Sequence, residues 1–551
     1  MKHQTTLNAY IQQSIRENWD SSAMTDFHGN TLIYRDVARK IAKLHILFKH
    51  AGLVQGDKIA FCGRNCSQWA VAALASLTYG TVAVPILHDF KPDTIHHLVS
   101  HCEAKLLFTD KATWEPLNHD DMPHLKGAVN IADYSLLFSR NKELTHAREK
   151  LNHLFGEKYP ERFAPEDVVY PDFDAQQLAV INYTSGSTGF SKGVMLSYGA
   201  LWSNIQYSID GLAFLKPGDG MVSMLPLAHM FGFSIELLHP LVKGCHIYFL
   251  TRTPSPKIIL EAFSVVKPKL IVAVPLILEK IVKTRIFPEL EKPMMKILLH
   301  TPGISKKVLA KIKDKMLESF GGNLKEIIIG GAGLNKEVET FLRKIKFPYT
   351  VGYGMTECGP LISYSSWQDA RPGSCGRIVD RMQVRIDSPD PAKTPGIIWV
   401  KGDNVMQGYF KNPEATEACF DADGWMNTGD IGQMDAKGFL YLRGRDKNMI
   451  LGPSGQNIYP EEIEQILNNL PYVAESIIVS QDGKLKALIH PDLDTAAHQG
   501  ISEKQIDQTM ADNIKRLNAE LPSFSQVSSY QIFKEEFEKT PKRSIKRYLY
   551  Q

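Results

Sequence analysis

Residues 183–193 read Tyr183-Thr184-Ser185-Gly186-Ser187-Thr188-Gly189-Phe190-Ser191-Lys192-Gly193. Glycines let backbone N–H groups converge on an anion without interference from Cβ atoms, the hydroxyls add donors, and the lysine adds positive charge. The stretch therefore predicts a loop that binds the phosphates of a ligand. A Ser/Gly-rich surface linker would have a similar composition, but this run is short and carries a lysine.

The loop does not have the spacing of a Walker A motif. Ser191 stands where that motif needs its second glycine, and a glycine follows Lys192. Apolar runs at 178–181 and 193–196 predict strands on both sides of the loop, and Ser197 is a suitable N-cap for a helix that follows. Because a P-loop runs directly into a helix, a P-loop kinase or GTPase is disfavoured.

Composition and charge exclude several classes of protein. The chain has 551 residues, of which 44% are hydrophobic and 22% charged, and its formal net charge is +3. These values are typical of a soluble protein with several compact units, and they leave no basic field for nucleic acid. The seven cysteines are scattered without a C-x-x-C pair, which indicates a reducing compartment. Since the N-terminus has no signal-peptide pattern, we expect a cytoplasmic protein.

One segment resembles a membrane span in its hydropathy. Residues 69–87 carry no charge over about the length that crosses a bilayer. Gly80 and the β-branched run that follows it instead predict a buried helix, a turn and a strand. We therefore expect no transmembrane span. Peripheral membrane contact stays open, although no basic amphipathic helix stands out, and the oligomeric state is not predicted.

Alternating helix and strand patterns predict the fold class. Two regions alternate in the manner of doubly wound α/β layers. Helices are expected at 34–49, 67–77, 94–101, 201–211, 233–241 and 256–265, and strands at 58–62, 81–84, 104–109, 220–224, 245–250 and 269–274.

Later residues predict smaller units. Short strands and turns after about residue 394 indicate a β-rich subdomain. Beyond it we expect helices at 460–469 and 502–517, and strands at 473–480 and 484–489. The prediction is an α/β protein with a large N-terminal domain (1–445) of two doubly wound sheets plus a small β-rich subdomain, and a small α+β C-terminal domain (446–551).

Four further islands carry residues suited to chemistry. They are 226–232 with His229 in an apolar turn, the glycine-rich 330–333 after a predicted strand, 352–357 with a tyrosine, a threonine and Glu357, and the pair 428–430 and 444–447. Each has an ordinary explanation when taken singly: His229 suits a protein core, and Glu357 suits a helix cap. Their order along the chain is more informative.

That order resembles the acyl-adenylate-forming (AMP-binding) superfamily, which includes acyl-CoA synthetases, luciferases and peptide-synthetase adenylation domains. The resemblance runs nearly end to end and extends to phrases such as Gly408-Tyr409 and Tyr459-Pro460-Glu461-Glu462. Within the superfamily the chain is most similar to long-chain fatty acid CoA ligases, notably at 275–281 and 447–450. The resemblance implies activation of a long-chain fatty acid with ATP to acyl-AMP, then transfer of the acyl group to coenzyme A.

The resemblance also implies which residues bind the nucleotide. Thr184 and Glu357 would bind Mg²⁺, and Thr356 would contact the α-phosphate as a catalytic residue together with Glu357. Asp430 would bind the ribose hydroxyls, with Arg445 near the ribose and phosphate. The β and γ phosphates would lie on Thr184, Ser185, Gly186, Ser187, Thr188, Gly189 and Lys192, and adenine between Tyr353, followed by Gly354, and the segment Gly331, Ala332, Gly333.

The same resemblance implies which residues bind the acyl group and coenzyme A. His229 would line the acyl pocket near the reacting carboxylate. Its apolar neighbours suit a fatty tail, and the same residues would equally form ordinary core. Lys447 takes the hinge position about which the mobile C-terminal domain would rotate between two half-reactions. Gly455 matches the loop along which the pantetheine of coenzyme A would pass.

One position departs from the superfamily pattern. The late motif reads roughly Lys-Thr-x-x-Gly-Lys-Ile-x-Arg, and its second lysine bridges the carboxylate and the α-phosphate. In this chain Ser544 aligns with that lysine, and the loss of one such donor costs about 10²–10³ in rate. Lys542 and Lys546 are catalytic candidates that would replace it, because residues two apart share a face in an extended tail. A helical tail would remove this argument, and a solvated basic tail is the alternative.

We expect an alanine at Lys542 or at Lys546 to lower ATP–pyrophosphate exchange, because either substitution would remove the cation that replaces the missing lysine. Exchange measured on both variants checks this, and unchanged rates in both would remove the compensation hypothesis.

Two other functions stay open. One is an acyl-AMP ligase that loads a carrier protein, which would share the first half-reaction. The other is a poorly catalytic binder of acyl-adenylate, motivated by Ser544. The length of the acyl chain is not determined by the sequence, because pocket depth depends on packing.

Overall fold

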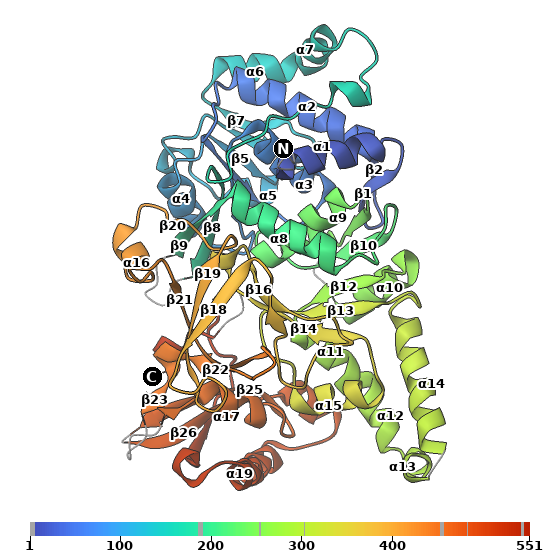
Figure 1. Cartoon of the computed structure of the whole chain (residues 1–551), viewed down its shortest axis with the longest axis vertical. Helices are drawn as coiled ribbons and strands as arrows, with labels where there is room; N and C mark the ends of the chain where they lie inside the picture. The colour runs from blue at the N-terminus through green and yellow to red at the C-terminus, as the bar shows by residue number, and fades with distance from the viewer. Residues whose placement is uncertain are drawn as a thin grey trace.

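The computed structural model describes residues 6–185, 191–252, 255–301, 304–451, 457–481, 483–540 and 545–550. Figure 1 shows an elongated molecule. Helices α1 to α7 lie toward one end of the long axis, and the C-terminal elements α17, α19, β25 and β26 lie at the other end. The N-terminal helices include α1 (Leu7–Glu17), α4 (Pro92–His101) and α5 (Lys111–Trp114).

The largest sheet has eight strands in the order β20-β9-β8-β4-β3-β5-β6-β7. Its central strands β8, β4, β3, β5 and β6 are parallel, and β9, β20 and β7 are antiparallel additions at the two edges. Strands β4 and β5 are buried along their whole length, which explains their continuous apolar sequences. The strands are β3 (Lys58–Cys62), β4 (Val82–Ile86), β5 (Leu106–Thr109), β6 (Gly127–Asn130), β7 (Leu136–Ser139), β8 (Leu178–Ser185), β9 (Ser191–Ser197) and β20 (Gly408–Tyr409).

The uncharged segment 69–87 is a helix, a turn and a strand, as predicted. Helix α3 (Ser67–Tyr79) ends at Gly80, whose φ of +90° forms a left-handed cap, and β4 follows. Of the helices in the described ranges, none is long and apolar enough to cross a membrane. Ser197 caps α8 (Tyr198–Gly211) through a 3.1 Å hydrogen bond that its Oγ accepts from Ala200 N, which confirms the predicted helix start.

The second alternating region is α/β as predicted, but its strands form two ladders. Strands β10 (Gly220–Ser223) and β11 (His246–Phe249) join β1 (Ser22–Asp26) and β2 (Thr31–Ile33), whereas β12 (Leu270–Ala273) forms a parallel ladder with β13 (Glu326–Ile329) and β14 (Tyr349–Val351). Strands β10 and β12 are neighbours. The hydrophobic pattern of a single strand does not indicate which distant strand it pairs with, so the sequence does not predict the two ladders.

Helices of this region lie around the two ladders. The predicted helix at 233–241 is a π-helix over Gly232–Leu238 followed by α9 (His239–Val242). The others are α10 (Pro256–Val266), α11 (Pro275–Ile281), a π-helical turn at Val282–Ile286, α12 (Phe287–Glu291), α13 (Pro293–His300), α14 (Ile304–Ser319) and α15 (Lys336–Lys344).

The β-rich subdomain and the α+β C-terminal unit follow, and both are predicted correctly in type. The subdomain contains β15 (Tyr353–Gly354), β16 (Leu361–Tyr364), β17 (Arg377–Ile378), β18 (Met382–Asp387), β19 (Gly396–Gly402), α16 (Pro413–Glu417), β21 (Met426–Met434) and β22 (Leu440–Arg445). The C-terminal unit contains β23 (Ile450–Leu451), β24 (Asn457–Ile458), α17 (Pro460–Leu467), β25 (Val473–Gln481), β26 (Lys484–Pro491), α18 (Leu493–His498), α19 (Glu503–Glu520) and β27 (Val527–Ile532). It has its own hydrophobic cluster.

Candidate active site

The predicted phosphate loop joins two antiparallel strands. In the β8–β9 ladder Thr184 lies opposite Lys192, and Thr184 Oγ1 donates a 3.5 Å hydrogen bond to Lys192 O. The prediction that this loop connects two strands, rather than a strand and a helix, is therefore confirmed. Ser185 is described through its backbone alone, and Gly186, Ser187, Thr188 and Gly189 lie outside the described residues.

Tyr409 connects Lys192 to Glu357. Strand β20 extends the sheet beyond β9, with Tyr409 opposite Val194. Lys192 Nζ lies 4.7 Å from the centroid of the Tyr409 ring, within cation–π range. The Tyr409 hydroxyl donates a 3.0 Å hydrogen bond to Glu357 Oε1. Glu357 belongs to the short 3₁₀ helix Thr356–Cys358 and is 9% exposed. A cation, a ring and a carboxylate thus form one connected set beside the loop.

Asp430 is held from two sides. Arg445 lies opposite it in the β21–β22 ladder, with Nε 3.1 Å from Asp430 Oδ1. Tyr353 donates a 2.7 Å hydrogen bond from its hydroxyl to Asp430 Oδ2. Burial raises the pKa of Asp430, and Arg445 and Tyr353 oppose that rise. The fold therefore brings Tyr353, Asp430 and Arg445 together, and both carboxylate oxygens of Asp430 have partners.

The glycine-rich segment after β13 leaves open space at the surface. Gly331 has a φ of +87°, and a Cβ added there would meet no atom within 4 Å. Gly331, Ala332 and Gly333 are exposed. Gly330 differs, because a Cβ there would lie 2.7 Å from Cε1 of Phe231. This close approach joins the end of β13 to the turn that carries His229.

The His229 turn is tied to two other parts of the N-terminal domain. Asn182 of β8 donates a 2.8 Å hydrogen bond from Nδ2 to Ala228 O. Asn65, which follows β3, donates a 2.6 Å hydrogen bond from Nδ2 to Leu225 O. Its Oδ1 accepts a 2.9 Å hydrogen bond from Leu227 N. His229 itself is half-buried. These bonds fix the backbone of the turn relative to the strand that leads into the phosphate loop.

Glu236 anchors the start of the same turn. It lies in the π-helix and is 0% exposed. Its Oε2 accepts hydrogen bonds from Ser223 Oγ (3.1 Å), Met224 N (3.0 Å) and Leu225 N (2.9 Å). Burial raises the pKa of Glu236 to about 8, so the neutral acid predominates at pH 7. Its Oε1 has no hydrogen-bond partner in the part of the chain that the structure describes.

Lys447 lies near two other cations, and α17 of the C-terminal unit contacts the glycine-rich segment. Partial burial and then Arg445 lower the pKa of Lys447, and Lys192 adds to the effect. These cations therefore face one region. Gln465 of α17 donates a 3.1 Å hydrogen bond to Leu334 O, and its Nε2 would lie 3.6 Å from a Cβ added at Gly333.

The family assignment rests on sequence models. A model of the AMP-binding enzyme family matches residues 11–410, which is more than half of the chain. The chain belongs to the AMP-binding enzyme family. A second model, for the AMP-binding enzyme C-terminal domain, matches residues 447–550 of this AMP-binding enzyme. The predicted superfamily resemblance is confirmed, and long-chain acyl-CoA synthetases are among the relatives.

Relatives and neighbouring structures are distant. "Long chain acyl-CoA synthetase 7, peroxisomal" from Arabidopsis thaliana is 29% identical over 508 residues, 84% of this chain and 69% of the relative. "Luciferin 4-monooxygenase" from Photuris pensylvanica is 27% identical over 471 residues, 82% of this chain and 78% of the relative. The structure of ATP-bound MatB from Rhodopseudomonas palustris aligns with a TM-score of 0.77 at 22% identity, covering 99% of this chain and 98% of that chain. This likeness shows a shared fold.

The tail of this AMP-binding enzyme is described on both sides of residues 541–544. Lys539 bridges antiparallel to Ile545, and Arg547–Leu549 form a 3₁₀ turn. The predicted shared face of Lys542, Ser544 and Lys546 depends on residues outside the described ranges, so it stays a prediction.

Lys546 has a local partner in this conformation. Its Nζ lies 2.9 Å from Glu538 Oε2, and its N–H donates a 2.8 Å hydrogen bond to Glu538 O. Lys542 and Ser544, like Gly455, lie outside the described residues. The catalytic roles of Lys542 and Lys546 therefore stay predictions.

Four residues of the site escaped sequence reasoning: Tyr409, Asn65, Asn182 and Glu236. The sequence indicates Tyr409 only as part of the Gly408-Tyr409 motif. Its role depends on the pairing of β20 with β9, two strands that are far apart in the chain. Asn182 and Glu236 did carry a signal. A polar side chain in an apolar strand or helix is costly to bury without a role, and both stand in such runs.

Proposed function

We propose that this AMP-binding enzyme activates a long-chain fatty acid with ATP and transfers the acyl group to coenzyme A. An oxygen of the acyl carboxylate attacks the α-phosphorus of ATP, and pyrophosphate leaves. The thiol of coenzyme A then displaces AMP and forms a thioester. The observation that carries the proposal is the connected set of Lys192, Tyr409 and Glu357, beside the cluster of Asp430 and Arg445.

The donor set suits phosphates and Mg²⁺. Lys192 supplies a cation at the base of the loop, and phosphoryl chemistry requires charge to be neutralised on phosphate oxygens. Thr184 and Glu357 offer oxygen ligands, which Mg²⁺ prefers. In the residues that the structure describes, no three His, Cys, Asp or Glu side chains gather as a metal site. Mg²⁺ would thus depend on phosphate oxygens and water, as is usual for this ion, and would neutralise phosphate charge when bound.

Asp430 supports the binding of a ribose. Its Oδ1 is paired with Arg445, whose side chain is 56% exposed and is free to turn into solvent. A ribose hydroxyl would then donate to Oδ1 while Tyr353 keeps its bond to Oδ2. Adenine would lie against Gly331–Gly333, where space is open. Tyr353 is 6% exposed and packs in the main hydrophobic cluster, so adenine would contact only a small part of its ring in this conformation.

The apolar surroundings of His229 support a fatty acyl group. Side chains near it in the turn and the π-helix are buried and apolar: Leu225, Leu227, Met230 and Phe233. The names of relatives add long-chain fatty acids at 26–29% identity, and they also add 4-coumarate at 25–27% identity. An aromatic acid is therefore the substrate that the test must separate from a fatty acid.

The test is pyrophosphate release with carboxylic acids of graded length and with 4-coumarate, each with and without coenzyme A. We expect release to be greatest with long-chain acids, and an acyl-CoA product by mass spectrometry. Acyl-AMP that accumulates without a thioester would favour transfer to a carrier protein. ATP binding without pyrophosphate release from any acid would favour a poorly catalytic binder.

Tyr409 gives a prediction that separates its two contacts. Tyr409→Phe removes the hydrogen bond to Glu357 and keeps the ring under Lys192. We expect ATP–pyrophosphate exchange to fall by roughly tenfold to a hundredfold, since such bonds to charged groups contribute about 1.5–3 kcal/mol. Tyr409→Leu also removes the cation–π contact, and we expect a further loss of about twofold to fivefold. The exchange rates of the two variants measure the contribution of the hydrogen bond and that of the cation–π contact separately. Equal rates in the wild type and both variants would contradict the role of Tyr409.

A further inference from the structure

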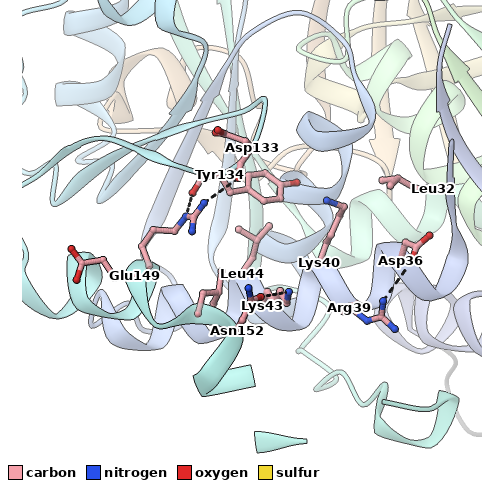
Figure 2. Close-up of a pocket in the computed structure, with 12 residues that line it drawn as sticks. Leu32, Asp36, Arg39, Lys40, Lys43, Leu44, Asp133, Tyr134, Glu149 and Asn152 are labelled. Atoms are coloured by element: carbon pink, nitrogen blue, oxygen red, sulfur yellow. Dashed lines mark hydrogen bonds and ion pairs between the residues drawn. The ribbon is translucent and has the colours of Figure 1, made fainter. Parts of the chain in front are cut away.

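A cavity of about 470 Å³ lies away from the candidate active site. Its walls come from α2 (Tyr34–His50), α6 (Lys142–Glu149), α7 (Leu151–Lys158) and the loop after β6. Figure 2 shows the side chains that line it. Along the long axis of the molecule, α6 and α7 lie at the end opposite the C-terminal unit (Figure 1). The cavity therefore belongs to a different part of the protein from Asp430 and Arg445.

Four cations converge on this cavity. Arg39, Lys40 and Lys43 lie within four positions of one another on α2, so they project from neighbouring points of one helix face. Other residues of α2, such as Val37 and Ile41, are buried in the hydrophobic core, which fixes the rotation of the helix. Arg148 of α6 completes the group.

Three of the four cations have uncharged hydrogen-bond or ring partners. Lys43 Nζ donates a 2.7 Å hydrogen bond to Asn152 Oδ1. Arg148 Nε donates a 2.5 Å hydrogen bond to the backbone oxygen of Tyr134. Lys40 Nζ lies 5.7 Å from the centroid of the Tyr134 ring and has no hydrogen bond to any described residue. Three positive charges therefore meet neutral groups.

Carboxylates near the cavity compensate part of this charge. Burial lowers the pKa of Lys40 and Asp36 opposes that effect, and hydrogen bonds from Ser135, with Arg148 nearby, lower the pKa of Asp133. Asp36 lies 3.9 Å from Arg39, and this is the one ion pair that the four cations make with carboxylates of the described chain. Asp133 and Glu149 are exposed, and Figure 2 shows the Glu149 carboxylate directed away from the lysines.

The cations also act on one another. Burial lowers the pKa of Lys40 and of Lys43. For Lys43, repulsion from Arg39, Lys40 and Arg148 lowers it further. A bound anion would relieve this repulsion, since an opposite charge within about 4–6 Å favours the charged form of a lysine.

We propose that this cavity binds the phosphate group of a phosphorylated ligand. A phosphate group suits a cluster of lysines and arginines better than a single carboxylate does, because it offers more acceptor oxygens, and a phosphate monoester also carries more charge. The volume exceeds that of phosphate alone and lies in the range of small-molecule sites. Leu32, Leu44 and the Tyr134 ring would contact the organic part. The same chemistry has two sources, a free phosphorylated metabolite or the headgroup of an anionic phospholipid.

The experiment compares the wild type with Lys40→Gln/Lys43→Gln, and with the control Lys49→Gln/Lys142→Gln. The control removes the same amount of charge, at Lys49 of α2 and Lys142 of α6, two exposed positions that do not line the cavity. Inorganic phosphate is titrated by calorimetry, and vesicles of phosphatidylglycerol and of phosphatidylcholine are tested by co-sedimentation. Thermal unfolding of each variant verifies that it is folded.

We expect the wild type and the control to bind alike, and the cavity variant to bind at least about tenfold more weakly, since two charge-assisted contacts are lost. Phosphate binding with this pattern supports the free-metabolite source. Binding to phosphatidylglycerol alone with this pattern supports the headgroup source. No binding to either probe, or equal affinity in the cavity variant, overturns the proposal. Because neither readout uses turnover, failure of the proposed ligase activity would leave this result unaffected.

Discussion

Replacing Glu357 with glutamine is expected to lower ATP–pyrophosphate exchange by about 10²–10³-fold, the usual cost of losing an electrostatic group at a phosphoryl-transfer site. Glutamine keeps the size of the side chain and can accept the hydrogen bond from Tyr409. It lacks the negative charge that would hold Mg²⁺ beside the phosphates. Exchange measured over a series of Mg²⁺ concentrations checks this, and partial recovery at high Mg²⁺ would identify the metal as the missing partner.

A matched control exists for this variant. Glu326 is also a buried glutamate, 2% exposed, and it accepts a 3.0 Å hydrogen bond from the hydroxyl of Tyr364. Glu326→Gln makes the same side-chain substitution at a buried site, at the opposite end of β13 from the glycine-rich segment. Burial raises the pKa of Glu326 to about 7, so this control tests the packing of glutamine at a buried site more than the loss of a full negative charge. We expect exchange close to that of the wild type. Equal losses in the two variants would show that Glu357 acts through stability, and no loss in Glu357→Gln would remove its assigned role.

The fold could be predicted where local pattern determines structure. Gly80 shows this, because a glycine after an apolar run predicts a left-handed cap, and the uncharged segment is therefore α3 and β4. Ser197 shows it again at the start of α8. What failed was pairing between distant strands. Strand β12 pairs with β13 and not with β11. Which strand pairs with which depends on packing across the whole chain, and the periodicity within one strand does not determine it.

The residues of the candidate site also fall into those that local sequence indicates and those that depend on long-range pairing. Lys192, Glu357 and Asp430 are predictable as candidates, because glycine-rich and acidic islands stand out in the sequence. Tyr409 was not assigned a role, because its two contacts come from β9 and from the 3₁₀ helix that carries Glu357. The replacement of Ser544 by Lys542 or Lys546 stays a prediction, because residues 541–544 lie outside the described ranges.

Glu236→Gln is expected to change how stability depends on pH. In the folded protein the pKa of Glu236 is about 8, raised by burial from its ordinary value of 4.5. Below pH 4.5 the carboxyl is protonated in both states, so its contribution is fully present. As pH rises toward 8 the unfolded chain ionises first, and the folded state loses about 1.4 kcal/mol per pH unit in this window. Between pH 5.5 and 7.5 the wild type should lose roughly 3 kcal/mol that the variant keeps.

Thermal unfolding of both proteins at pH 5.5, 6.5 and 7.5 measures this difference. Glutamine is a close substitute for the neutral acid, because its oxygen can accept the three bonds that Oε2 accepts from Ser223, Met224 and Leu225. We therefore expect similar midpoints at pH 5.5 and a higher midpoint for the variant at pH 7.5. Parallel profiles for the two proteins would contradict the shifted pKa.

The same carboxyl should affect turnover at alkaline pH. Above about pH 8 Glu236 ionises within an apolar core, and a buried charge without a cationic partner is costly. The backbone at Met224 and Leu225 leads directly into the His229 turn, so a shift there would move the predicted acyl pocket. We expect the wild type to lose activity with an apparent pKa near 8 and Glu236→Gln to keep it. Identical alkaline limbs would separate Glu236 from the function of the turn and leave it a purely structural residue.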